Sequence, residues 1–270
     1  MATRPRRSCL TVPAASARML AKAPTLAADE IVIDLEDGVP PEEKTDAMRA
    51  QMVAAVRAGA ESTVAVRING VESPWWRDDL AAIADARPDV VVIPKVESAE
   101  DVAAVAELVP AGTGLEAQIE TARGLVEVER IAAAGHGLEA LVFGPGDFGA
   151  SLGVPVLTIG AGSWDYALAR IVVAARAFGL QAVDGPYAAI RDLDGLRASA
   201  AHALAHGYDG KWVVHPDQIA PVNDVFTPSP EELERARRIL AAGEGATLVD
   251  GEMVDKATHR LAEALVARAR

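Results

Sequence analysis

Two acidic residues in this chain each follow a short apolar stretch, and together they have the chemistry of a cation site. Glu120 ends the stretch that begins at Leu115, and Gln118 would share its side of a strand. Asp147 comes 27 residues after Glu120, behind the apolar run from Ala140 and a glycine turn. A charged side chain at the end of a buried strand is costly unless a partner compensates it. We therefore expect Glu120 and Asp147 to lie on neighbouring strand ends and to hold one cation.

The donor atoms of this pair predict the metal. Adjacent strands lie about 4.8 Å apart, and two carboxylates at that distance repel by roughly 3–4 kcal/mol at an effective dielectric of about 20. A divalent cation between them turns the repulsion into attraction. Oxygen ligands alone favour Mg²⁺, or Mn²⁺, over zinc. The alternative is that Glu120 pairs with Lys95 or Arg123 while Asp147 caps a turn.

Polar residues also end the other predicted strands. They are Glu36 and Asp37, Arg67 and Asn69, Lys95, Asp184 and His215. Arg67 has a planar guanidinium that suits a substrate carboxylate or enolate oxygen. Its alternative role is a buried salt bridge to Glu36 or Asp37. These two acids are also candidate catalytic residues, because they can orient Arg67 or bond to metal-bound water. Lys95 is expected to balance carboxylates, and His215 to brace a loop.

Eight apolar runs along the chain supply the strands that would position these residues. We predict strands at 7–13, 30–37, 63–69, 89–96, 115–120, 140–144, 181–187 and 211–216. We predict helices at 16–28, 42–60, 75–86, 98–108, 123–134, 163–178 and 193–206, with Ser98 as the cap of the helix at 98–108. An open doubly wound sheet usually has five or six strands, so eight favour a closed (β/α)8 TIM barrel. The active sites of such barrels lie at the carboxyl ends of the strands.

The last part of the chain falls outside the barrel pattern. Residues 1–228 form the predicted barrel, and residues 229–270 form a C-terminal helical extension. Within the extension we predict helices at 231–242 and 252–270 with a loop between them. An extension of this kind covers a site or packs on a neighbouring subunit.

The composition excludes several classes of function. The formal net charge of −13 argues against nucleic acid as a partner, because phosphate neutralisation needs basic patches. No run approaches the roughly 18 apolar residues of a membrane span, so no membrane partner is expected. The single cysteine, Cys9, rules out an internal disulfide within this chain and favours a cytoplasmic location.

One glycine motif suggests a different class of protein. Residues 144–149, Gly-Pro-Gly-Asp-Phe-Gly, match the G-x-G-x-x-G pattern of dinucleotide-binding turns. Asp147 would place a negative charge beside the pyrophosphate, and residues 151–160 are not expected to open a helix. The motif also follows five βα units, whereas the fingerprint belongs in the first turn. We therefore favour the metal interpretation over an NAD-dependent dehydrogenase.

Several segments together resemble a known family, the citrate lyase β-subunit-like branch of the HpcH/HpaI aldolases. The matching segments are residues 7–13, 33–39, 66–69, 94–96, 119–122, 143–148, 210–212 and 215–218. The resemblance implies a magnesium-dependent carbon–carbon lyase that acts on the thioester of a 3-hydroxy acid. By it, Glu120 and Asp147 are the metal ligands, and Arg67 and Glu120 bind substrate.

The resemblance also implies a mechanism, a retro-Claisen cleavage. It releases a 2-oxo or 3-oxo acid and a thioester enolate, whose charge Arg67 would offset. In relatives that act on coenzyme A thioesters, an aspartate on a C-terminal lid of a neighbouring subunit protonates the enolate. Residues 251–255 are similar to that lid, which makes Asp255 the candidate acid. The alternative for Asp255 is a surface residue near a helix start.

The leading hypothesis is therefore an acyl-CoA lyase of the malyl-, citramalyl- or hydroxymethylglutaryl-CoA type, assembled as a homotrimer or hexamer. The runner-up is a citrate lyase β subunit that acts on a thioester of an acyl carrier protein. An NAD-dependent dehydrogenase and a non-catalytic scaffold are the alternatives from other classes.

Overall fold

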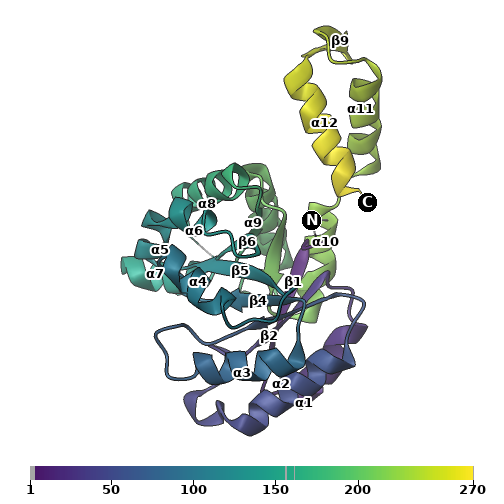
Figure 1. The fold of residues 1–270 in the computed structure, drawn as a ribbon. Coiled ribbons are helices and arrows are strands. Elements are labelled where there is room, and N and C mark those ends of the chain that lie inside the picture. Colours follow the sequence, from purple (N-terminus) through teal and green to yellow (C-terminus); the bar gives the residue numbers. More distant parts are fainter. Residues whose placement is uncertain (1–3, 156, 161, 270) are drawn as a thin grey trace. The chain divides into compact units, whose positions relative to one another are not determined.

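Eight parallel strands close into a barrel, as predicted (Figure 1). The computed structural model describes residues 4–155, 157–160 and 162–269. The strands are β1 (Ser8–Pro13), β2 (Glu30–Asp34), β3 (Thr63–Arg67), β4 (Val90–Ile93), β5 (Gly114–Ile119), β6 (Leu138–Phe143), β7 (Gln181–Asp184) and β8 (Gly210–Val213). The barrel closes through β1 and β8, where Ser8 pairs with Lys211. Mostly small and β-branched side chains fill a buried core cluster: Cys9, Val32, Ala65, Val90, Val92, Ala140, Val142, Val183 and Trp212.

Most strands end earlier than the apolar pattern predicted, and this places the polar residues in loops. β2 ends at Asp34 and β4 at Ile93, so Glu36, Asp37 and Lys95 follow their strands. The register aligns Asp34 with Arg67 on the neighbouring strand. Aligned residues of adjacent strands point to the same side of a sheet. Short strands with polar loops thus bring these side chains together at one end of the barrel.

Helices connect successive strands, and a last helix follows β8. They are α1 (Ala17–Lys22), α2 (Asp46–Ala58), α3 (Trp76–Ala86), α4 (Ala99–Ala106), α5 (Ala122–Val126), α6 (Val128–Ala132), α7 (Pro145–Leu152), α8 (Asp165–Ala177), α9 (Leu193–His206) and α10 (Ile219–Phe226). Short 3₁₀ turns lie at Ala23–Thr25, Pro41–Glu43 and Pro216–Gln218. Ser98 caps α4 in a capping box with Asp101, as the sequence predicted. The predicted helix at 123–134 is divided at Glu127, and α10 was not predicted.

The loop after β5 has a short cap of its own. The hydroxyl of Thr121 accepts a hydrogen bond from the amide of Gly124 and starts α5. Gly124 is required there, because a Cβ would lie 2.4 Å from the carbonyl oxygen of Val96. This close packing fixes the chain immediately after Glu120.

The chain divides into two compact units, Met1–Asn223 and Asp224–Arg270. Beyond the end of α10, the second unit contains α11 (Pro230–Ala241), β9 (Thr247–Val249), β10 (Glu252–Val254) and α12 (Lys256–Arg268). Its core is formed by Ala236, Ile239, Val254 and Ala262. The predicted loop at 243–251 is interrupted by β9, and the predicted start of a helix at 252 is wrong. Residues 247–254 instead form a hairpin, in which Met253 pairs with Leu248. Among the described residues, no helix is long and apolar enough to cross a membrane.

Candidate active site

Glu120 is held rigidly just beyond the end of β5. Its side chain is almost fully buried, and Oε1 accepts a hydrogen bond from the backbone amide of Lys95 at 2.8 Å. Oε2 accepts a second from the side-chain amide of Gln118 at 2.7 Å, so the predicted shared side of these residues is observed. Gly144 leaves room for the carboxylate, since a Cβ there would lie 2.3 Å from Oε2. The ends of β4, β5 and β6 therefore together position the carboxylate of Glu120.

The surroundings of Glu120 suit a cation. Burial, followed by the negative charges of Glu36 and Asp147, raises the pKa of Glu120 to about 8, although Arg67 and Lys95 oppose the rise. A carboxylate in this position lacks enough positive charge around it, and a divalent cation would supply that charge. The nearby donors Glu120 and Asp147 are both carboxylates, so the residues present fit Mg²⁺.

Asp147 lies in the first turn of α7 and reaches the same cluster from β6. The first turn of a helix favours a negative charge. Burial raises the pKa of Asp147, and the charge of Asp37 adds to this effect while Lys95 opposes it. Its carboxylate is 3.7 Å from the ammonium of Lys95 and about two-fifths exposed. Asp147 is thus the more open of the two acids.

Lys95 joins the acids into one group. We call this group the carboxyl-end cluster: Glu36, Asp37, Lys95, Glu120 and Asp147. The Lys95 ammonium bonds to Glu36 and lies 3.6 Å from Asp37. Lys95 has a left-handed backbone with φ of 51°, a conformation that is uncommon for a residue with a Cβ. The predicted role of Lys95, balancing carboxylates, agrees with these contacts. The alternative pairing of Glu120 with the Lys95 ammonium is not observed, because Glu120 binds the Lys95 amide.

Arg67 is anchored by a residue that the sequence analysis did not single out. Its guanidinium donates two hydrogen bonds of 2.7 Å to the two carboxylate oxygens of Asp34. The predicted pairing with Glu36 also exists, at 3.2 Å, but it is not the principal one. Arg67 makes no ion pair with Asp37 among those the structure describes. The guanidinium also lies over the ring of Trp212, 5.3 Å from its centroid. The pairing of Asp34 with Arg67 follows from the register of β2 and β3, and the sequence alone does not give that register.

A cavity of about 770 Å³ opens beside the cluster. Glu36, Asp37 and Lys95 contribute to its wall, together with loops after β2, β3 and β4. Lys44, missed by the sequence analysis, also lines it and donates to the carbonyl of Glu36 at 2.9 Å. Glu36, Asp37 and Lys95 of the cluster therefore border a space that admits a small molecule.

Comparison with known proteins identifies the family. A family model described as HpcH/HpaI aldolase/citrate lyase matches residues 7–216. This chain belongs to the HpcH/HpaI aldolase/citrate lyase family. It is 39% identical over 303 residues to the L-malyl-CoA/beta-methylmalyl-CoA lyase of Cereibacter sphaeroides, covering 98% of this chain and 95% of that protein. It is 40% identical over 264 residues to the (3S)-malyl-CoA thioesterase of the same organism, covering 93% and 90%.

Solved structures agree with this assignment. CitE from Mycobacterium tuberculosis, in complex with magnesium, acetoacetate and coenzyme A, matches with a TM-score of 0.82 at 35% identity, covering 99% of this chain and 98% of that one. RipC from Yersinia pestis matches with a TM-score of 0.72 at 34% identity, covering 86% and 99%. This member of the HpcH/HpaI family is a magnesium-dependent lyase. The predicted family, barrel, cofactor and reaction class are confirmed.

Some predicted strand-end residues do not join the carboxyl-end cluster of this lyase. Asp184 forms a buried ion pair with Lys211. His215 accepts a hydrogen bond from the amide of Asp217 at 3.2 Å and caps a 3₁₀ turn, which is the predicted bracing role. Asn69 donates to Asp79 at 2.7 Å. Asp184 and His215 serve the framework of the barrel, whereas Asn69 also accepts a hydrogen bond from Lys44 and lines the cavity.

A helix overlaps the glycine motif of residues 144–149. The described residues of 151–160 open no helix, as expected, but α7, which was not predicted, begins at Pro145 inside the motif. The other objection to dinucleotide binding stands, because Asp147 lies in the first turn of that helix beside Lys95. In this family member, the glycine at 144 makes room for Glu120.

Asp255 lies in the second unit, where it caps α12. Its Oδ1 accepts hydrogen bonds from the amides of Ala257 and Thr258 and from the Thr258 hydroxyl. The bond from the Thr258 amide is the largest of the effects that lower the pKa of Asp255. The observed contacts of Asp255 are therefore those of a helix cap.

Proposed function

We propose that this enzyme cleaves a malyl-CoA-type 3-hydroxyacyl-CoA to a 2-oxo acid and an acyl-CoA, with the carboxyl-end cluster as its catalytic centre. The observation that carries the proposal is that buried Glu120 and partly exposed Asp147 both contact Lys95, which lines a cavity together with Glu36 and Asp37. The lyase relative named for L-malyl-CoA and beta-methylmalyl-CoA supports the substrate class. The net charge of −13 means that an anionic thioester must be captured by local cations.

In this proposal, Glu120 and Asp147 hold the magnesium ion. When bound, the ion supplies a Lewis acid that stabilises negative charge on a substrate oxygen. Gln118 and the Lys95 amide orient Glu120, so that its carboxylate is in place before substrate arrives. Such orientation by surrounding hydrogen bonds is typical of metal ligands.

Arg67 would bind the oxygen that becomes anionic when the carbon–carbon bond breaks. Asp34 holds the guanidinium through its Nε and Nη2 atoms. Nη1 is directed toward Glu36 and Gln118, at 3.2 and 3.5 Å. This nitrogen is the one that would donate to the substrate. A donor fixed before the reaction stabilises developing charge without reorganisation.

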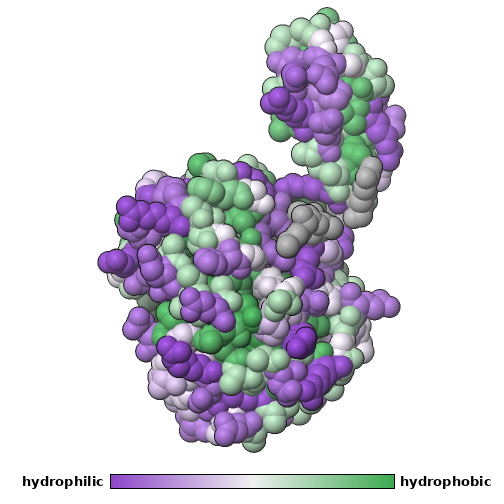
Figure 2. Space-filling model, in the orientation of Figure 1, coloured by the Kyte–Doolittle hydropathy of each residue, from purple (hydrophilic) through white to green (hydrophobic). Residues whose placement is uncertain are grey.

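Asp255 is the proposed proton donor to the enolate carbon. As a cap its pKa is lowered, so it would need to lie beside the negative charge of the enolate to gain a proton. We propose that it acts on the barrel of a neighbouring subunit in a homotrimer or hexamer. Large apolar side chains on the surface of the second unit support a subunit contact: Leu248, Met253 and Leu261. Hydrophobic residues are visible on the surface of that unit in Figure 2.

A complementation experiment tests this role in trans. Asp255→Asn is expected to retain magnesium binding but slow cleavage, and Glu120→Gln to lose magnesium-dependent cleavage. Mixed oligomers of the two variants should regain activity, because some sites combine an intact Glu120 with an intact Asp255 of a neighbour. Unchanged kinetics of Asp255→Asn would remove it from the mechanism. Light scattering gives the oligomeric state.

The substrate proposal is tested with a panel of acyl-CoA thioesters, assayed with and without magnesium. Release of glyoxylate, pyruvate, oxaloacetate or acetoacetate identifies the acyl group. We expect glyoxylate from malyl-CoA. A citryl thioester of acyl carrier protein tests the alternative of a citrate lyase β subunit, which the CitE structures keep open. Absence of NAD binding would dispose of the dehydrogenase alternative.

A second candidate reaction is hydrolysis of the thioester. It is favoured by the 40% identity to a (3S)-malyl-CoA thioesterase. The two reactions differ in their products from the same substrate. Carbon–carbon cleavage gives glyoxylate and acetyl-CoA, whereas hydrolysis gives malate and free coenzyme A. A thiol reagent together with a glyoxylate assay therefore separates them. The single buried cysteine is consistent with our further proposal of a cytoplasmic enzyme.

A further inference from the structure

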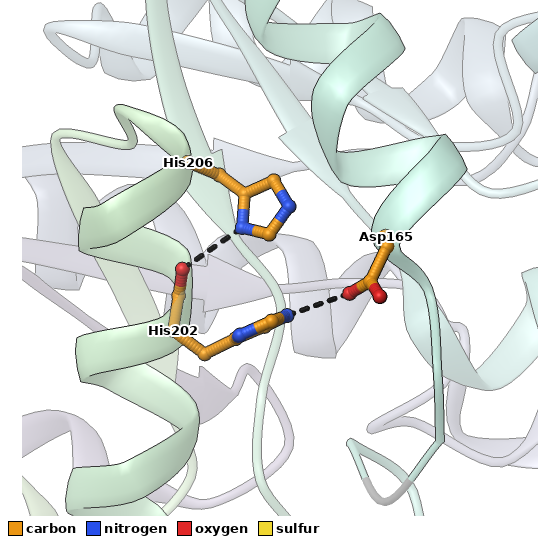
Figure 3. Close-up of side chains that lie close together, drawn as sticks. All are labelled: Asp165, His202 and His206. Atoms are coloured by element: carbon orange, nitrogen blue, oxygen red, sulfur yellow. Dashed lines mark hydrogen bonds and ion pairs between the residues drawn. The ribbon is translucent and has the colours of Figure 1, made fainter.

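A second group of metal-binding side chains lies on two helices of the barrel unit. Asp165 is the first residue of α8, while His202 and His206 lie in the last turns of α9 (Figure 3). The three residues each offer one ligand atom, and these atoms lie within 4.8 Å of one another. Among the residues that the structure describes, no other group of three histidine, cysteine or acidic side chains brings its ligand atoms this close together. None of its members belongs to the carboxyl-end cluster.

The spacing on α9 brings the two imidazoles together. Residues four apart in a helix lie on the same face. The rings of His202 and His206 meet edge to face with centroids 4.6 Å apart. From the neighbouring helix, the Asp165 carboxylate approaches Nε2 of His202 to 2.7 Å. Two helices therefore contribute ligands to one point, which a single helix face would not achieve.

The hydrogen bond of His206 prepares one of its nitrogens for a metal. Nδ1 lies 3.0 Å from the backbone carbonyl of His202. A carbonyl oxygen only accepts, so Nδ1 carries the proton and the neutral ring has its lone pair on Nε2. Metal-binding histidines commonly have their other nitrogen bonded to a carbonyl in this way. His206 is also the last residue of α9, and the carboxyl end of a helix favours a positive charge.

The existing contacts leave room for rearrangement. The side chains of Asp165 and His202 are about half exposed, so small rotations can bring all donors to the roughly 2.0–2.2 Å that zinc requires. In such a site the cation would replace the direct contact between His202 and Asp165. Three protein ligands would leave a coordination position for water.

We infer that Asp165, His202 and His206 form a second cation site, selective for a divalent transition metal such as Zn²⁺ over Mg²⁺. Two imidazoles and one carboxylate suit zinc, cobalt or nickel, whereas magnesium prefers oxygen ligands. The bound ion links α8 to α9 and stabilises the folded chain, because the unfolded chain does not hold the three ligands together.

Calorimetric titration of the full chain with zinc, in excess magnesium to occupy the acidic site, tests this inference. We expect one zinc site in the wild type. Its affinity should fall by at least about tenfold in His202→Ala, in His206→Ala and in Asp165→Asn, since loss of even an indirect partner of a metal ligand costs that much. His259→Ala is the matched control, because His259 also lies on a helix with an acid, Glu263, four residues on. This control should bind zinc as the wild type does.

A second measurement uses spectroscopy and stability. Cobalt bound to the wild type should show the visible absorption of a nitrogen-ligated ion, and the His202→Ala/His206→Ala double variant should not. Zinc should raise the melting temperature of the wild type and of His259→Ala but not that of the double variant. Equal zinc affinity in the wild type and the double variant would overturn the inference. So would zinc binding that magnesium displaces completely.

Discussion

The barrel contains two groups of acidic side chains, one toward each end of its strands, and they are compensated in different ways. We call the second group the amino-end cluster: Arg6, Glu30, Glu116 and Glu139. The side chains of Arg6, Glu30 and Glu116 are fully buried, and Arg6 contacts all three acids at 2.5–3.2 Å. In the carboxyl-end cluster, by contrast, the Asp37 and Asp147 side chains are 58% and 39% exposed.

The difference separates a structural cluster from the one that we propose to be reactive. Arg6 offers a rigid fork of donors that matches several carboxylates at once. A sealed cluster of this kind has no access for a ligand. In the carboxyl-end cluster one ammonium, Lys95, contacts Glu36, Asp37 and Asp147, and a cavity lies beside it. Such a cluster can accept a cation and a substrate.

The largest expected effect comes from the two proposed magnesium ligands of the carboxyl-end cluster. Glu120→Gln and Asp147→Asn should each reduce magnesium-dependent turnover by more than about 10³-fold, because a neutral amide cannot replace an anionic ligand. The barrel should remain folded, since Glu120 is already a costly buried charge. Initial rates of 2-oxo acid release and magnesium titrations measure the loss. Asp46→Asn, at an exposed acid, is the control. Activity within about tenfold of wild type would contradict the assignment.

Breaking the amino-end cluster should affect stability instead. Arg6→Met leaves buried carboxylates without their cation, and we expect the free energy of unfolding to fall by about 3–5 kcal/mol. Urea denaturation measures it. Arg4→Met, which removes a partly exposed partner of Glu139, should cost less than about 1 kcal/mol. Equal losses of unfolding free energy in the two variants would contradict the larger contribution to stability that we assign to the buried Arg6.

Arg67 shares features with both clusters. It is nearly as buried as Arg6 of the amino-end cluster, but it lies at the carboxyl end of the strands, where we propose that the reaction takes place. Arg67→Lys should lower kcat/KM by roughly 30- to 160-fold, which is a loss of about 2–3 kcal/mol in transition-state stabilisation. The reason is that one ammonium cannot bond both oxygens of Asp34 and also serve the substrate. The exposed pair Arg57 and Asp85 supplies the control, Arg57→Lys. Steady-state kinetics decide the question, and a wild-type value of kcat/KM for Arg67→Lys would argue against a role in the reaction.

The smallest effect concerns the pH dependence of stability. Burial and the charge of Glu116 raise the pKa of Glu30 well above its usual range, and Arg6 only partly offsets this. The stability that Glu30 contributes is therefore complete below its unfolded pKa of about 4.3 and is lost as the pH rises through its folded pKa. Glu30→Gln, whose side chain does not titrate, should flatten this decline. Urea denaturation across this pH range tests it, and parallel curves for variant and wild type would refute it.

Much of this organisation follows from the sequence. The eight apolar runs determine the number of strands, and the polar residues after them mark the end of the barrel where we propose that the reaction takes place. The sequence also predicts Glu120, Asp147 and Arg67 as candidate site residues, because charged residues at the ends of apolar strands are costly without a partner. The Ser98 cap was also evident, because capping depends on residues that are close in sequence.

Other features were decided only by the tertiary structure. Asp34 anchors Arg67 because the register of β2 and β3 aligns them across 33 residues of sequence. Gly144 is needed because Glu120 of the preceding strand occupies the space of its Cβ. The amino-end cluster and the site of Asp165, His202 and His206 join residues from separate elements. Local sequence governs which residues form a strand or a helix, but only barrel closure and helix packing determine which of their side chains meet.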